Sequence, residues 1–239
     1  MVASLDMAQD PLAPPVHFFR AATQEARAFV RLASLLPYDW ASSVPAHAGE
    51  GDDVVVLVHG TLATAGAWRP LRRRLGALPR THSAVFTYGP RSGVLGVASA
   101  LASILRQVPT RVRVHLVGHS LGGLAVRWFV QQLPPDARVV QTVTVAAPFS
   151  GARGARFFPG PAGRDMTRGS PTLRTLVSTA ARPGLPHLSI FGSADTAVAG
   201  DTAFPVGERV IVPDAGHNAL LFDEGVASRI IERLYAERG

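Results

Sequence analysis

Residues 112–123 read Val-Arg-Val-His-Leu-Val-Gly-His-Ser-Leu-Gly-Gly, and this stretch decides the fold. It begins as an apolar, β-branched run typical of a buried strand, and from Gly118 onward the periodicity becomes helical. Ser120 therefore falls at a sharp strand-to-helix turn, whose apex residue is held in a strained backbone conformation. Gly118 and Gly122 lack a Cβ, which lets the helix pack close beneath the serine. The pattern predicts a hydroxyl above the sheet edge, beside the free N–H groups of a helix N-terminus.

The rest of the chain alternates strands and helices with the spacing of right-handed βαβ units. This alternation predicts an α/β protein with a mostly parallel central sheet of about six strands and helices on both faces. Besides the strand at 112–117, we expect strands at 53–59, 83–88, 139–146, 188–192 and 208–213, and helices at 67–78, 94–108, 121–133 and 219–236.

Composition excludes several classes of chemistry and partner. The 239 residues contain no cysteine, so disulfides and thiolate metal sites are ruled out. The net charge of +7 comes from arginines that are scattered along the chain without an aromatic ladder or a nucleic-acid motif, so we expect no nucleic-acid partner. The first residues lack the segments of a secretory signal, and no apolar run reaches the ~18 residues that cross a bilayer. We therefore expect a cytoplasmic protein.

An activated serine needs two further side chains. A hydroxyl becomes a good nucleophile when an imidazole takes its proton, and a carboxylate must fix the tautomer of that imidazole. Asp195 and His217 each follow a predicted strand, so both fall at the sheet edge that carries Ser120. Asp201 is the alternative carboxylate if the loop is longer, and Asp214 is a loop-forming residue. We assign His119 to packing.

Attack of a serine on a carbonyl group also needs two N–H donors aimed at the carbonyl oxygen, which becomes negative. This arrangement is called an oxyanion hole. Leu121, one residue past the nucleophile, supplies one backbone donor. The loop after the first strand supplies the other, for which we expect Thr61. His59 is assigned a structural role in that loop. This chemistry uses no metal and no cofactor, and we expect neither.

Several motifs between residues 53 and 236 resemble the α/β-hydrolase family, and within it the small bacterial lipases and related esterases. The resemblance implies that fold and the chain order serine, aspartate, histidine. Exported lipases carry an export signal that this chain lacks, which favours an intracellular carboxylesterase over a triacylglycerol lipase. The matching motifs are His59-Gly-Thr61, Gly118-His-Ser-Leu-Gly-Gly123, Ala147-Pro-Phe-Ser-Gly151, Asp165-Met-Thr-Arg-Gly-Ser-Pro-Thr-Leu173, Gly192-Ser-Ala-Asp195 and Gly216-His217.

The chain divides into two parts in this interpretation. Residues 1–50 are an N-terminal extension with an amphipathic helix and a linker, and residues 51–239 are the catalytic domain. Residues 149–186 interrupt the strand–helix alternation as a lid-like insertion, with one clear helix at 170–179. The insertion is rich in arginine, so we expect it to favour anionic substrates or interfaces.

The helix predicted at 16–36 has an apolar face and a basic face. We expect the apolar face to pack on the domain, while a membrane-surface role or a dimer contact remains the alternative. The apolar positions are Phe19, Ala22, Ala26, Phe29, Ala33 and Leu36, and the polar ones are Arg20, Gln24, Arg27 and Arg31.

The leading hypothesis is a serine hydrolase that cleaves carboxylic esters, of small molecules or lipids, through an acyl-enzyme intermediate. Thioesterase, amidase and acyltransferase activities use the same three side chains and stay open, as does a non-catalytic binding protein on this scaffold. Leu62 is expected at the substrate site. Phe149, Phe157 and Phe158 either line an acyl pocket or belong to the core.

Overall fold

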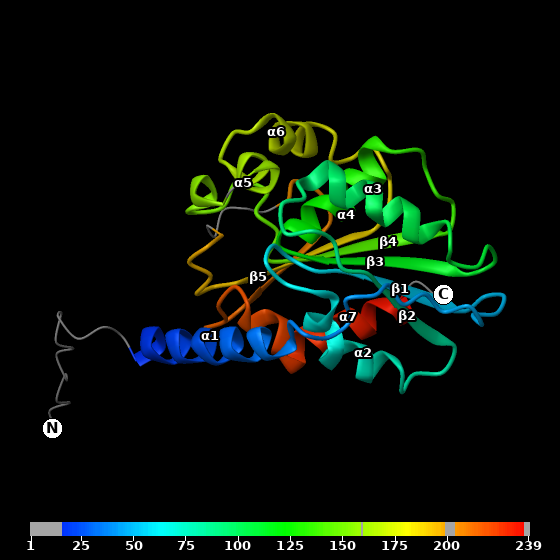
Figure 1. The fold of residues 1–239 in the computed structure, drawn as a ribbon, viewed down its shortest axis with the longest axis horizontal. Coiled ribbons are helices and arrows are strands. Elements are labelled where there is room, and N and C mark those ends of the chain that lie inside the picture. The colour runs from blue at the N-terminus through cyan, green and yellow to red at the C-terminus, as the bar shows by residue number, and fades with distance from the viewer. Residues whose placement is uncertain (1–15, 159, 199–203, 237–239) are drawn as a thin grey trace, which may run out of the picture.

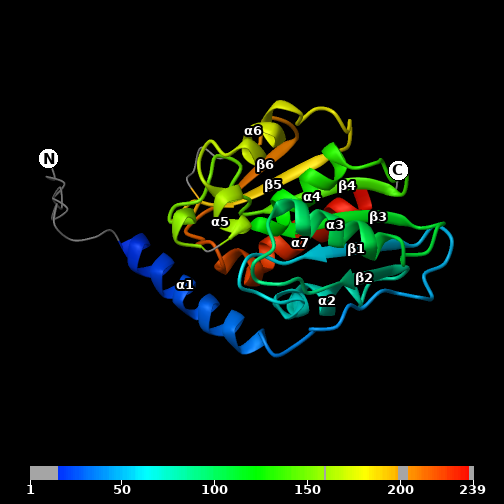
Figure 2. The same ribbon diagram turned by 45° about the horizontal axis from the view of Figure 1, so that its top comes forward.

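A sheet of six parallel strands forms the centre of the molecule, in the order β2-β1-β3-β4-β5-β6. The computed structural model describes residues 16–158, 160–198 and 204–236. The strand order can be followed from bottom to top in Figure 2. The strands are β1 (Asp53–Val58), β2 (Thr81–Val85), β3 (Arg113–His119), β4 (Val139–Val145), β5 (His187–Gly192) and β6 (Glu208–Val212). The predicted six-stranded parallel sheet is confirmed.

Helices cover both faces of this sheet, as predicted (Figure 1). One face carries α3 (Val94–Leu105), α4 (Leu121–Gln132), α5 (Pro161–Met166) and α6 (Pro171–Ser178). The opposite side carries α1 (Val16–Leu35), α2 (Arg69–Leu75) and α7 (Glu224–Ala236). Short 3-10 helices lie at Ala65–Trp68, Ala155–Phe157 and Ala219–Phe222. Within the described residues, no helix is both long enough and apolar enough to cross a membrane.

Strand β1 shows why its sequence is a continuous apolar run. Its side chains alternate between the two faces of the sheet. Val54, Val56 and Val58 pack toward α3 and α4, whereas Val55 and Leu57 pack toward α2 and α7. All five are completely buried. A strand covered by helices on both faces has no solvent-facing position, so the alternation of apolar and polar residues disappears.

The connections of β1 create the crevice in which a ligand can bind. The chain passes from β1 to β2 on one side, and β3 then pairs with β1 on the other side. The loops after β1 and β3 therefore leave in opposite directions, which opens a crevice at their carboxyl ends. Thr61 follows β1 and Ser120 follows β3, so both candidate residues lie at this switch point.

The prediction of one helix at 219–236 is wrong. The segment begins as a 3-10 helix at Ala219–Phe222, and α7 begins only at Glu224. Asp223 separates the two, and its Oδ1 accepts a hydrogen bond of 2.9 Å from the amide of Val226. An aspartate in this position caps a new helix start and breaks the preceding one.

The helix predicted at 16–36 is α1, but the prediction of its packing face is wrong. Ala21 and Ala28 are the buried positions, whereas Phe19 and Phe29 are 59% and 64% exposed. Small side chains let α1 approach the 3-10 helix at Ala219–Phe222 closely, so the alanines face the domain. Leu32 also packs on the core, whereas Phe19 and Phe29 do not. The sequence pattern identified an apolar stripe that the structure leaves largely in solvent.

Replacing Gly122 by alanine should destabilise the protein by roughly 1–3 kcal/mol. An alanine Cβ there would lie 2.4 Å from the carbonyl oxygens of Val58 and His59, and these backbone atoms cannot move aside cheaply. Gly96→Ala in α3 is the matched control, because its Cβ would meet nothing closer than 3.8 Å. We expect Gly96→Ala to be neutral or to stabilise by about 0.5–1 kcal/mol. Urea unfolding measures both, and equal stability of Gly122→Ala and the parent would contradict this packing.

Candidate active site

Ser120 occupies the turn between β3 and α4 in a left-handed backbone conformation, with φ 53° and ψ −121°. Its amide donates a 2.9 Å hydrogen bond to the carbonyl of Val145 in β4. The close approach of α4 to the sheet depends on two glycines. A Cβ at Gly118 would lie 2.4 Å from the carbonyl oxygen of Gly122. The strained conformation is held by this packing and turns the serine away from the strand axis.

Asp195 and His217 form a hydrogen-bonded pair across two loops. The Nδ1 of His217 lies 2.7 Å from the Oδ2 of Asp195. The other oxygen of the carboxylate accepts the amides of Ala197 and Val198, at 2.9 and 2.8 Å. The aspartate side chain is 2% exposed. A carboxylate oxygen in this position accepts a hydrogen bond from Nδ1 and leaves Nε2 as the ring nitrogen that faces away from Asp195.

Ser120 and His217 open into the same cavity, which has a volume of about 440 Å³. No hydrogen bond joins the Ser120 hydroxyl to His217 among the described residues. Such contacts are often long before substrate binds and shorten in the complex. Thr61 and Leu62 from the loop after β1 line the cavity beside them. The insertion supplies Ala152, Arg153, Phe158 and Met166 to its wall, and α1 supplies Glu25, Phe29, Leu32, Ala33 and Leu36.

The two candidate oxyanion donors lie beside this serine. Leu121 is the first residue of α4, so its amide has no partner within the helix. Thr61 lines the cavity, and its buried hydroxyl has no hydrogen-bond partner among the described residues. The loop before Thr61 passes very close to the serine, because a Cβ at Gly60 would lie 3.1 Å from the Cβ of Ser120.

Solved structures share this arrangement of elements, although no protein-family model and no curated protein matches the sequence. The mature lipase BlEst2 of Bacillus licheniformis has a TM-score of 0.61 at 15% identity, over 82% of this chain and 97% of that one. The monoacylglycerol lipase of Paleococcus ferrophilus has a TM-score of 0.61 at 18% identity, over 82% of this chain and 98% of that one. A membrane phospholipase A has a TM-score of 0.59 at 16% identity, over 94% of each chain. This chain has the α/β-hydrolase fold. At these identities the likeness establishes the fold alone.

His59 stabilises the loop after β1. Its Nδ1 donates to the carbonyl of Gly60 at 2.8 Å, and its Nε2 accepts the amide of Tyr88 at 3.3 Å. The ring stacks on Tyr88 at 4.0 Å, and the tyrosine hydroxyl donates to the His59 carbonyl at 2.6 Å. Burial lowers the pKa of His59 to about 4, so the imidazole is neutral at physiological pH. These contacts agree with a structural role.

His119 does more than the packing that we assigned to it. Its Nε2 donates a hydrogen bond of 3.1 Å to the backbone carbonyl of His217. Its Nδ1 is buried, with no partner among the described residues. Burial, together with the neighbouring His217, lowers the pKa of His119 to about 3. A neutral His119 thus holds the backbone of the residue that we assign as the base.

The predicted pocket residues have three different surroundings. Leu62 and Phe158 line the cavity, and Phe149 takes the alternative place in the core, whereas Phe157 lies in neither place. Phe149 is 3% exposed and packs in the core, with its ring 4.4 Å from that of Phe204. Phe157 is 75% exposed and lies against Arg156 at the surface. Adjacent aromatic residues in an irregular segment point in different directions, and their order in the sequence does not say which one faces the cavity.

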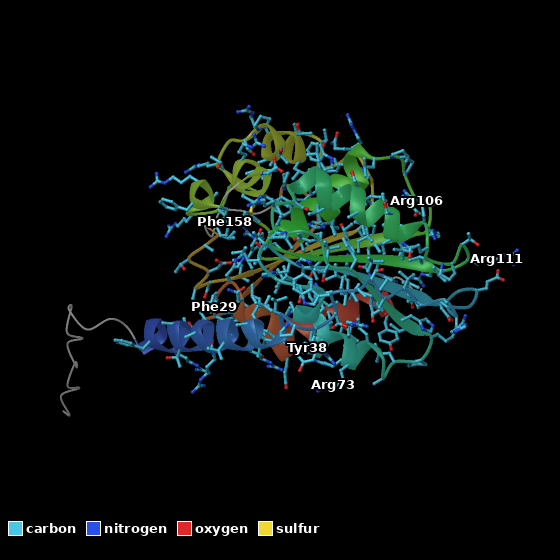
Figure 3. All side chains as sticks on the ribbon, viewed as in Figure 1. Phe29, Tyr38, Arg73, Arg106, Arg111 and Phe158 are labelled. Atoms are coloured by element: carbon cyan, nitrogen blue, oxygen red, sulfur yellow. The ribbon has the colours of Figure 1, made fainter. Side chains whose placement is uncertain are left out.

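Residues of α1 at the cavity wall were not expected, since the pattern placed that helix in a separate extension. Figure 3 labels Phe29 of α1 and Phe158 of the insertion on the same side of the molecule. The amide of Asp214 donates a hydrogen bond of 2.9 Å to the hydroxyl of Ser193, and Asp201 lies outside the described residues. The described part of the chain contains no group of three side chains able to hold a metal ion.

The free energy of unfolding should fall as the pH drops from about 7 to about 5, and His59 should contribute to that slope. The folded-state pKa of His59 lies near 4, below its ordinary value of 6.5. The unfolded chain therefore binds more protons between these values, so this stabilisation is complete above 6.5 and is lost toward 4. His59→Phe should reduce the slope by up to about 1.4 kcal/mol per pH unit. Urea unfolding at several pH values measures this slope, and an unchanged slope in His59→Phe would refute the lowered pKa of His59.

Proposed function

We propose that this protein is a serine hydrolase that cleaves carboxylic esters through an acyl-enzyme intermediate. The observation that carries the proposal is the Asp195–His217 hydrogen bond of 2.7 Å, with His217 opening into the cavity that Ser120 lines. This arrangement matches the roles of base and orienting carboxylate beside a nucleophile on a strained turn. The α/β-hydrolase fold places the loops of all three residues at one edge of the sheet.

The steps follow from the chemistry of these groups. The Nε2 of His217 takes the proton of Ser120 as its oxygen attacks the ester carbonyl carbon, and the imidazolium returns that proton to the leaving alcohol. Asp195 stabilises the imidazolium and keeps its orientation. The amides of Thr61 and Leu121 bind the negative oxygen of the tetrahedral intermediate. Water, activated by the same imidazole, then attacks the acyl-serine and releases the acid.

The lining of the cavity favours an ester with an apolar acyl chain. Much of the wall is apolar, and the polar residues that line it besides Ser120 and His217 are Glu25, Thr61, His119, Arg153, Thr196 and Asn218. Apolar walls with a few placed polar groups are typical of small-molecule sites. The solved structures of similar fold include a lipase, a monoacylglycerol lipase and a phospholipase A, which supports an ester as the substrate class. The apolar wall residues are Phe29, Leu32, Leu36, Leu62, Phe158 and Met166.

Ser120→Ala should lower kcat/KM for p-nitrophenyl esters by about 10³-fold or more, because the nucleophile is removed. A fluorophosphonate label should map to Ser120 in the parent and be absent from this variant. Ser103→Ala is the matched control, because this serine of α3 does not line the cavity and its hydroxyl forms hydrogen bonds within its own helix. A panel of esters, thioesters and amides of graded chain length identifies the preferred bond. Full activity of Ser120→Ala would refute the proposed nucleophile.

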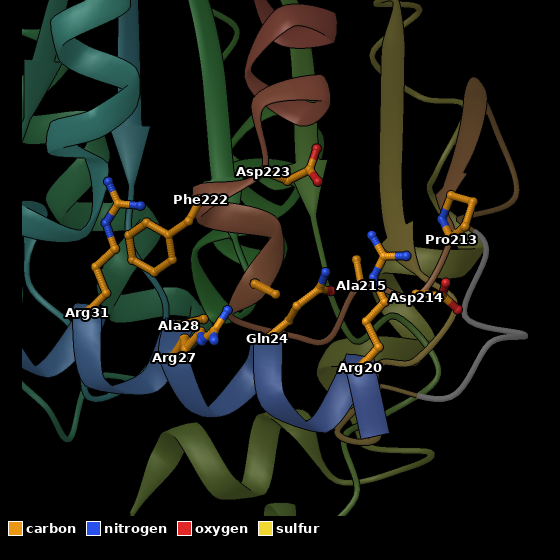
Figure 4. Close-up of a pocket in the computed structure, with 11 residues that line it drawn as sticks. Arg20, Gln24, Arg27, Ala28, Arg31, Pro213, Asp214, Ala215, Phe222 and Asp223 are labelled. Atoms are coloured by element: carbon orange, nitrogen blue, oxygen red, sulfur yellow. The ribbon is translucent and has the colours of Figure 1, made fainter. Parts of the chain in front are cut away.

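We also propose that α1 contacts an anionic lipid surface. Phe19, Phe29 and Val30 are 59–69% exposed along this helix, and Phe29 reaches the cavity. Arginines lie on its other flank, in a groove of about 470 Å³ that Asp214, Phe222 and Asp223 also line (Figure 4). Exposed aromatic residues beside arginines suit the boundary between headgroups and acyl chains. Contact at α1 would bring lipid esters to the cavity mouth. The arginines are Arg20, Arg27 and Arg31.

The double variant Phe19→Ser/Val30→Ser should bind phosphatidylglycerol vesicles roughly 10-fold or more weakly than the parent, because two apolar side chains no longer insert. Arg20→Gln/Arg27→Gln should reduce binding to the same vesicles and its dependence on salt. Leu95→Ser, which changes an exposed leucine of α3, should leave binding unchanged. Co-sedimentation measures these affinities. Equal binding of the parent to phosphatidylglycerol and phosphatidylcholine vesicles would refute the anionic preference.

A further inference from the structure

A carboxylate of α1 holds the backbone that directly follows His217. The Oε1 of Glu25 accepts the amide of Asn218 at 2.9 Å and the side-chain Nδ2 of the same residue at 2.7 Å. The Oε2 accepts the amides of Asn218 and Ala219, each at 3.0 Å. Both oxygens of the carboxylate are thus occupied. Glu25 lies 193 residues from Asn218 along the chain, so this contact exists only because α1 docks here.

The approach of this carboxylate depends on a glycine beside the histidine. A Cβ at Gly216 would lie 2.4 Å from the Oε2 of Glu25. Any other residue at this position would push the carboxylate away from the two amides. Gly216 therefore leaves room for the carboxylate of Glu25 directly beside His217.

We infer that Glu25 is a positioning residue for His217, an inference that rests on the proposed function. Three contacts then fix the histidine: Asp195 holds the imidazole, His119 holds the backbone carbonyl, and Glu25 holds the next two amides. Hydrogen bonds from amides to a carboxylate are charge-assisted and stronger than neutral ones. Loss of Glu25 leaves those amides unpaired in a partly buried place and releases the loop on one side.

Catalysis is sensitive to such a release because proton transfer requires the imidazole within hydrogen-bond reach of the hydroxyl. A displacement of about 1 Å costs on the order of 10²-fold in rate. The effect falls on kcat, because Glu25 acts through the loop of the base. Substrate affinity, set mainly by the apolar wall, changes less.

The test compares Glu25→Ala, Glu25→Gln and the control Glu232→Gln, which changes an exposed carboxylate of α7. Amide hydrogen exchange reports the protection of Asn218 and Ala219, and p-nitrophenyl ester kinetics report kcat and KM. We expect Glu25→Ala to lose protection at both amides and to lower kcat about 100-fold with KM within about threefold. Glu25→Gln keeps one carbonyl acceptor, so its kcat should fall only about 10-fold. Glu232→Gln should match the parent in both measurements.

Folding of each variant is checked by circular dichroism and thermal unfolding. A second variant, Gly216→Ala, keeps the carboxylate but displaces it, and should give the same losses as Glu25→Ala. A folded Glu25→Ala that keeps amide protection, or that keeps the kcat of the parent, overturns the inference. If the parent hydrolyses no ester, the proposed function fails, and the inference about catalysis fails with it. The exchange data still decide whether Glu25 holds the amides of Asn218 and Ala219.

Discussion

The left-handed backbone of Ser120 is the constraint on which the site depends. A strand can pass into a helix this abruptly only where the helix lies almost in contact with the sheet, and Gly118 and Gly122 allow that contact. The cost of the strained residue is offset by the buried packing of β3 and α4 around it. The same close approach brings the loop after β1 against the serine. One turn thereby brings the candidate nucleophile close to the two residues that carry the candidate amide donors.

The candidate base, in contrast, is held by contacts that come from separate parts of the chain. Asp195 follows β5, His119 ends β3 and Glu25 belongs to α1, and each contacts His217 or the residues beside it. Each of these contacts restricts the loop in a different way, and Asp214 within the loop also has a positive φ of 56°. The neutral state of buried His119 suits this role, since a charged imidazole there would repel a charged His217.

Helix α1, which we expected to belong to a separate extension, has three properties that concern the candidate site. It forms part of the cavity wall, it carries the carboxylate that holds the loop after β6, and it exposes two aromatic side chains, of which Phe29 lines the cavity. Glu25, Phe29 and Leu32 recur at intervals of four and three residues, so the cavity wall and the carboxylate share one side of the helix. The boundary that we expected near residue 50 thus crosses the candidate site, since the cavity takes its wall from both sides of it.

The sequence by itself determined the parallel sheet, the turn at Ser120 and the loops that carry Asp195 and His217, because strand runs, glycine spacing and chain order are local patterns. Only the tertiary structure decided which of the aromatic residues of the insertion faces the cavity, which side of α1 packs on the domain, and that Glu25 reaches the loop of the base. Those outcomes depend on how distant segments approach each other. Side-chain surroundings in a folded chain are set by such packing, which no stretch of sequence contains.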